Sequence, residues 1–298
     1  MVSLVIVADD CGISLARTEG IVHAMLHGLL SHTSLMVNMP HSRYAVKLLR
    51  HHGLLGRVGL HLNLTEGVPL SPTGSVPSLV MGTMHEFLGK DVFRTKCISG
   101  KIDVDDVYKE VTAQLTLFRE YVGQYPQHVD AHQHVHILPP LVPTIGKLLQ
   151  QHGVTFVRAP VQHVLQADAK CVSCAVISRY AAAAQVYFRA CGLRCLDAFV
   201  GLTFCNDVYT VSDVVDAVKV QLALGATSIE MMTHPGLTDL IVIDSFGRST
   251  DRPCEVAVLC DPLLRSRLSH YVHVVEFDQL LVSAILDRTE LCVEKNSN

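Results

Sequence analysis

Short apolar segments alternate with segments of helical periodicity along most of the chain. The apolar segments are LVIVAD, TSLMVN, RVGLHLNL, HVDAHQHVHIL, TFVRA, DAFVGL, SIEMMTH and HVVEF. Several are followed by helical patterns such as EGIVHAMLHGLL, YAVKLLRHHG, LVPTIGKLLQQHG and VSDVVDAVKVQLALG. Alternation of this kind gives βαβ units and a mainly parallel sheet. The sequence therefore predicts an α/β fold that is (β/α) barrel-like, a distorted TIM barrel with seven or eight βα units.

The remaining segments are one long helix and two irregular stretches. A helix is predicted over residues 103–122, where apolar residues fall at helical spacing before Gly123. Residues 67–100 and 235–255 show little periodicity. The first stretch is longer than an ordinary connection, and we interpret it as a candidate lid. With no repeats or linkers, we expect a single domain over 1–290 and a loose tail over 291–298.

Composition narrows the class of protein. Hydrophobic residues make up 49% and charged residues 17% of the chain, which favours a large core and excludes disorder. The net charge of -4 and the lack of any basic run argue against nucleic acid as a partner. The N-terminus is typical of a strand and not of a signal peptide, and no apolar run is long enough for a membrane helix. We therefore expect a soluble, cytoplasmic protein with reduced cysteines; a homo-oligomer remains open.

Four of the ten cysteines are spaced as in a zinc ribbon: Cys171, Cys174, Cys191 and Cys195. The segment AVISRYAAAAQVYFRA between the two pairs is strongly helical. A helix of that length would hold the pairs roughly 25 Å apart. Core cysteines at the helix ends are therefore favoured over a zinc ribbon.

Polar side chains gather at the ends of four predicted strands, where parallel α/β sheets bind their ligands. Because faces alternate along a strand, HVDAHQHVHIL places ionisable residues of even number on one face. The four groups are Asp9 with Asp10, His61 with Asn63, Asp130 with His132 and His134, and Glu230 with His234. Each group has a plainer interpretation, as helix caps, hydrogen-bonded structural residues or a solvated face. Their recurrence favours a metal or catalytic site.

The motifs VADDCGIS, GLHLNLTEG, DAHQHVHILP, TFVRAP and MTHPG, in that order, resemble those of the YdjC-like carbohydrate deacetylases, which include chitooligosaccharide deacetylases. The resemblance runs from Val5 to about Phe277. It implies a barrel-like fold and a divalent metal ion used to remove the acetyl group from N-acetylated sugars. By the resemblance, Asp9 is the catalytic base and Asp10, His61 and His132 are metal ligands. His234 matches the general acid. Cys11 stands where the family usually has Phe.

Two histidines and one carboxylate leave coordination positions open for water and substrate. Such a site suits magnesium or zinc, and also cobalt or nickel. The expected substrate is a small N-acetylated saccharide. Five further residues are expected to bind substrate or to orient the site: Asn63, Asp130, His134, Arg158 and Glu230. The alternatives are a metal-dependent hydrolase of another amide or of a phosphoester, and a catalytically silent sugar-binding protein.

Overall fold

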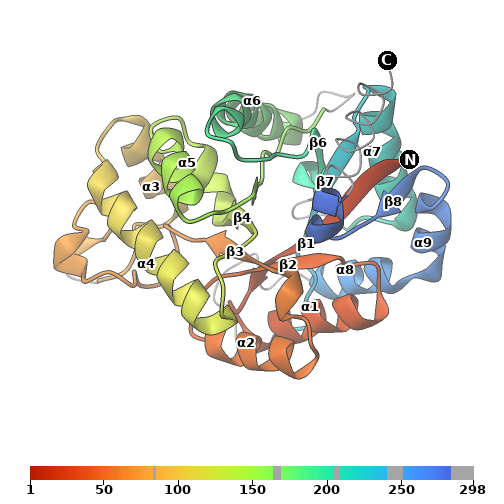
Figure 1. Ribbon diagram of the computed structural model, residues 1–298, viewed down its shortest axis with the longest axis horizontal. Coiled ribbons are helices and arrows are strands. Elements are labelled where there is room, and N and C mark those ends of the chain that lie inside the picture. The colour runs from red at the N-terminus through yellow and green to blue at the C-terminus, as the bar shows by residue number, and fades with distance from the viewer. Residues whose placement is uncertain (83–84, 164–168, 205–207, 240–250, 283–298) are drawn as a thin grey trace, which may run out of the picture.

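A computed structural model describes residues 1–82, 85–163, 169–204, 208–239 and 251–282 (Figure 1). The strands are β1 (Val2–Cys11), β2 (His32–Leu35), β3 (Val58–Leu62), β4 (His128–Ala131), β5 (Phe156–Val157), β6 (Ala198–Val200), β7 (Ser228–Thr233) and β8 (Val272–Val274). The α-helices are α1 (Leu15–His27), α2 (Ser42–His51), α3 (Lys90–Ile98), α4 (Val104–Val122), α5 (Val142–Gln151), α6 (Ala169–Ala190), α7 (Val211–Ala223), α8 (Asp251–Cys260) and α9 (Pro262–Leu268). Short 3-10 turns are η1 (Leu55–Arg57), η2 (Thr73–Ser75), η4 (His132–Ile137) and η5 (Leu202–Phe204).

The strands form one parallel sheet in the order β5-β4-β3-β2-β1-β7-β6, with β8 paired to the start of β1. The sheet is curled and helices surround it (Figure 1). At the open side of the sheet, β5 hydrogen-bonds to Arg194 in the segment before β6, and among the described residues no ladder joins β5 to β6. The predicted α/β barrel-like fold is confirmed, and the barrel is incompletely closed.

The long helix α4 follows the sequence prediction closely. The Asp103 side chain accepts a hydrogen bond from the N–H of Asp105 and caps the helix. Gly123 ends it at φ 99°, a left-handed conformation that glycine adopts without strain. The buried face carries Val107, Val111, Leu115 and other residues that join the main core. The predicted boundaries, 103–122, are therefore confirmed.

The irregular segment 67–100 is more ordered than its sequence suggested. It contains α3, and Leu79, Phe87 and Phe93 within it are buried in the main core. The buried carboxylate of Glu110 on α4 accepts hydrogen bonds from the N–H groups of Leu70 and Ser71. The expectation of little regular structure is wrong for residues 90–98. Of the second irregular segment, 235–255, residues 240–250 lie outside the described residues, and the expectation of little regular structure is wrong for 251–255, which begin α8.

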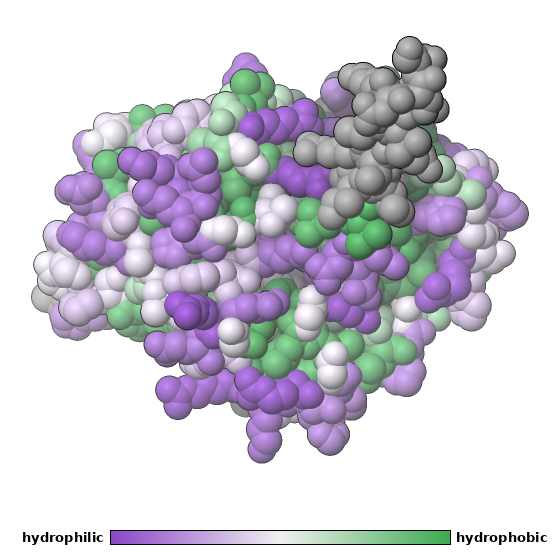
Figure 2. Space-filling view, in the orientation of Figure 1, coloured by the Kyte–Doolittle hydropathy of each residue, from purple (hydrophilic) through white to green (hydrophobic). Residues whose placement is uncertain are grey.

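The predicted helix between the two cysteine pairs is present as α6. Among the described residues, none of the side-chain clusters able to hold a metal ion contains a cysteine. Hydrophilic residues spread over the part of the surface formed by α3 and α4, with smaller hydrophobic areas between them (Figure 2). Within the described chain, every helix is too short or too polar to span a bilayer. The single domain over 1–290 stays a prediction, and the tail 291–298 lies outside the described residues.

Candidate active site

A bulge near the end of β1 aims two consecutive aspartates at the site. Ala8 pairs with Thr33 and Cys11 with Leu35, so β1 carries one residue more than β2 between these pairs. Asp10 takes up the extra length with φ 65°, a conformation that short polar residues tolerate better than most. The side chains of Asp9 and Asp10 therefore meet different partners, and both are buried.

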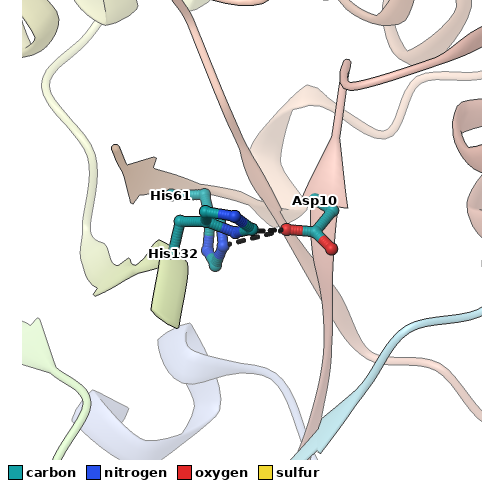
Figure 3. Close-up of side chains that lie close together, drawn as sticks. All are labelled: Asp10, His61 and His132. Carbon is teal, nitrogen blue, oxygen red and sulfur yellow. Dashed lines mark hydrogen bonds and ion pairs between the residues drawn. The ribbon is translucent and has the colours of Figure 1, made fainter. Parts of the chain in front are cut away.

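Three side chains from three strand ends converge on one point (Figure 3). Oδ1 of Asp10 lies 2.9 Å from Nδ1 of His132 and 3.2 Å from Nε2 of His61. Nitrogen and oxygen ligands lie about 2.0–2.2 Å from zinc, which separates neighbouring ligand atoms by roughly 3–3.5 Å. The observed spacings fit one shared ion, and all three residues are buried.

His61 is held by a second carboxylate behind it. Its Nδ1 lies 2.8 Å from Oδ1 of Asp130, and Asp130 also accepts a hydrogen bond of 2.9 Å from the hydroxyl of Ser34. A carboxylate on the far nitrogen fixes the tautomer and ring orientation of a metal-binding histidine. Burial alone would lower the pKa of His61, but Asp130, Asp9 and Asp10 raise it to about 10. The three carboxylates around His61 therefore favour positive charge at this place in the site.

Arg158 lies at the centre of a group of buried carboxylates. Its Nη1 and Nη2 bind the two oxygens of Asp9 at 2.6 and 2.8 Å. Nη2 also lies 2.7 Å from Asp130, and Nε lies 2.6 Å from Glu230. Of the two uses left open for Arg158, binding a sugar hydroxyl or holding carboxylates, the contacts are those of the second. Two further groups of carboxylates and histidines that could hold a metal ion lie here, Asp9 with His61 and Asp130 and His128 with Asp130 and Glu230, and Arg158 contacts the carboxylates of both.

Asp9 lies beside the three converging residues, and Arg158 donates to both of its oxygens. Burial raises its pKa to about 6, against the opposing effect of Arg158. Nε2 of His234 lies 4.0 Å from Oδ2 of Asp9. Burial, together with Arg252 and Arg17, holds the pKa of His234 well below its ordinary value, so the ring is neutral at neutral pH.

The strand predicted over residues 128–138 ends at Ala131, and this prediction is wrong beyond that point. Gln133 and His134 adopt left-handed φ values of 55° and 56°, which turn the chain into η4. Strand alternation therefore stops after His132, and His134 does not share its face as predicted. His134 instead lies edge-on to Phe199, and His136 Nε2 lies 2.8 Å from the carbonyl of Arg158.

Asn63 follows β3 and shapes the turn after it. Its Oδ1 accepts hydrogen bonds from the N–H groups of Thr65 and Glu66, and its Nδ2 donates to the carbonyl of Glu66 and to Asn38. These contacts point away from the three converging residues. Asn63 thus orients the loop beside the site, and the structure gives it no contact with Asp10, His61 or His132.

Sequence reasoning missed four side chains that contact these residues: Ser34, Arg17, Arg252 and Glu255. Arg17 Nη1 lies 3.5 Å from Asp10 and 3.4 Å from the carbonyl of His234. Glu255 accepts the N–H of His234 at 2.6 Å. Arg17 precedes the predicted helical pattern that begins at Glu19, and Glu255 is the last residue of the irregular stretch 235–255, so neither periodicity gave a signal for them.

Comparison with known proteins finds relatives over most of the chain. A family model described as YdjC-like protein matches residues 3–270. A carbohydrate deacetylase from Homo sapiens is 38% identical over 283 residues, covering 89% of this chain and 87% of that protein. A chitooligosaccharide deacetylase from Serratia marcescens is 30% identical over 266 residues, covering 89% of this chain and 94% of that protein.

A solved structure from Enterococcus faecalis V583, a candidate cellobiose-phosphate cleavage protein, has the same fold. It superposes with a TM-score of 0.73 at 21% identity, covering 93% of this chain and 98% of that one. The family match spans most of the chain and carries every one of the converging residues. The chain therefore belongs to the YdjC-like protein family.

Proposed function

We propose that this protein is a metal-dependent hydrolase that removes acetyl groups from N-acetylated sugars or oligosaccharides. The observation that carries the proposal is the convergence of Asp10, His61 and His132, with donor atoms 2.9 and 3.2 Å apart, beside the separate carboxylate of Asp9. The relatives named carbohydrate deacetylase and chitooligosaccharide deacetylase support the substrate class. Magnesium or zinc suits the mixed nitrogen and oxygen donors.

The three converging residues would hold the ion, and Asp9 would act on water. When bound, the ion polarises the amide carbonyl and lowers the pKa of a water molecule in the site. Asp9 takes a proton from that water, for which a pKa of about 6 is well placed. Arg158 holds both oxygens of Asp9 and so fixes the direction from which the proton is taken. The water oxygen bonds to the carbonyl carbon of the substrate.

The departing nitrogen needs a proton, because an amide anion is too poor a leaving group. His234 is the proposed donor. Since its ring is neutral at rest, it must first receive a proton, and Asp9 Oδ2 lies 4.0 Å from its Nε2. The proton removed from water thus passes through Asp9 and His234 to the nitrogen as the C–N bond breaks. The products are a free amine and acetic acid, which releases its proton to solvent and leaves as acetate.

Acetate release from N-acetylglucosamine oligomers, with and without a chelator, tests the proposal. Release that stops with chelator and returns with added metal supports it. Metal binding without release from any acetylated saccharide would instead favour a silent sugar-binding protein. Phosphate release from a phosphoester would favour the other hydrolase, although a single cation site suits that chemistry less well. A cytoplasmic location, the absence of nucleic-acid partners and a possible homo-oligomer stay predictions from sequence.

A further inference from the structure

The segment that carries His234 is held by helices and not by the sheet. Strand β7 ends at Thr233. The N–H of His234 then donates to Oε2 of Glu255 at 2.6 Å, and its carbonyl accepts from Nη1 of Arg252 at 3.1 Å. Both groups belong to α8. The peptide groups of His234 are therefore fixed by side chains from a helix distant in sequence.

The residues after His234 are fixed at both sides. The N–H of Gly236 donates to the carbonyl of Arg252 at 3.2 Å. The N–H of Leu237 donates to the carbonyl of Ala16, a residue of α1, at 2.9 Å. A Cβ on Gly20 would lie 2.5 Å from Cα of Gly236, so the two backbones are in close contact. These contacts begin two residues after His234, and the N–H of His234 itself is held by Glu255.

The two α8 side chains that hold the peptide groups of His234, Glu255 and Arg252, are both charged and buried. Glu255 and Arg252 are 3% and 1% exposed, and they pair at 2.9 Å one helical turn apart. Oε2 of Glu255, the oxygen that binds His234, also accepts a hydrogen bond of 3.1 Å from the hydroxyl of Tyr209. Burying charged groups is unfavourable unless each is paired and hydrogen-bonded. Here both members of the buried pair hydrogen-bond to the main chain of His234, a proposed catalytic residue.

We propose that Glu255 is a positioning residue for the deacetylation reaction, acting through His234 by holding its peptide N–H. This inference rests on the proposed function. A displacement of about 1 Å at a reacting group can lower the rate by about 100-fold. Glu255→Ala should therefore lower kcat by about 10- to 100-fold, with KM and bound metal nearly unchanged.

The test is a double-mutant cycle on acetate release with Glu255→Ala, His234→Ala and the double variant, each assayed with metal content measured. If Glu255 acts through His234, its substitution should cost almost nothing once His234 is absent. Glu255→Gln, whose amide oxygen can still accept the N–H, should retain most of the activity. Should Glu255→Ala fail to fold, Glu255→Asp takes its place in the cycle, because the shorter side chain withdraws the oxygen from His234.

Glu110→Ala is the matched control. Glu110 is also a buried glutamate that accepts backbone N–H groups, those of Leu70 and Ser71. Its loss should lower stability, and any effect on kcat should be the same with and without His234. Additive losses for Glu255 and His234, loss of metal, or an unchanged kcat in Glu255→Ala would each overturn the inference. Absence of acetate release from the wild-type protein would instead refute the proposed function itself.

Discussion

Replacing Arg158 by lysine tests the balance of charge beneath the site. Arg158 is fully buried and makes four contacts of 2.6 to 2.8 Å with the carboxylates of Asp9, Asp130 and Glu230. Lysine keeps the positive charge but brings one nitrogen in place of three. It cannot reach all three carboxylates from the same backbone position, so at least one is left buried without its cation.

Removing one partner of a buried ion pair costs about 3–5 kcal/mol. Folded proteins are stable by only about 5–15 kcal/mol, so Arg158→Lys should lose about a fifth or more of the unfolding free energy. Urea denaturation followed by circular dichroism at neutral pH measures this loss. Glu230→Gln added to Arg158→Lys should recover part of it, because it removes one of the excess carboxylates.

Arg189→Lys is the control for this experiment, because Arg189 pairs with Asp197 at 3.2 Å while both side chains are more than a third exposed. An exposed pair of this kind contributes at most about 1 kcal/mol, and its lysine variant should unfold almost as the wild type does. If Arg158→Lys also unfolded within about 1 kcal/mol of the wild type, the carboxylates would not depend on Arg158 and the reasoning would be refuted.

Three further predictions concern metal, base and pH. Asp9→Asn should abolish acetate release and leave bound metal intact by elemental analysis, and metal loss would contradict its assignment as base. His61→Ala and His132→Ala should each deplete bound metal, and full occupancy in both would remove them from the set of ligands. Burial, together with His128 and Arg57, lowers the pKa of His32 from 6.5 to about 3. Below pH 6.5 the unfolded chain therefore binds a proton at His32 that the folded protein does not bind. The free energy of unfolding should fall as pH drops below about 6.5, by up to ~1.4 kcal/mol per pH unit. His32→Phe should flatten that slope in urea denaturation between pH 4 and 7, and an unchanged slope would count against the low pKa of His32.

The place of the site could be predicted, because polar residues gather at the strand ends of a parallel sheet, and the resemblance to the family implied Asp10, His61 and His132 as ligands. Strand alternation failed after β4, which ends at Ala131. The left-handed turn at Gln133 and His134 involves neither Gly nor Asn, so local sequence carried no sign of it. Helix α3 was missed because only Phe93 and Cys97 face inward over its length, too few for a periodic pattern.

Contacts between segments that lie far apart in the chain could not be predicted from the sequence. Arg158 was expected to meet either a sugar or a carboxylate, and no pattern in TFVRA distinguishes the two. Which groups Arg158 contacts depends on which strands lie beside β5 and β1 in the sheet. The anchor of His234 on α8 depends on a helix that follows an irregular segment, where neither strand nor helix periodicity fixes the spatial arrangement.

The strand that bears Asp9 and Asp10 is the first element of the chain, yet its hydrogen-bonding neighbours include β7 and β8, from the last third. A nascent chain emerging from the ribosome must therefore wait for residues beyond 228 before this strand gains its partners on that side. On the proposed function, metal binding should therefore come late in folding, and chains truncated before β7 should bind no metal, because the strand that carries Asp10 lacks this partner.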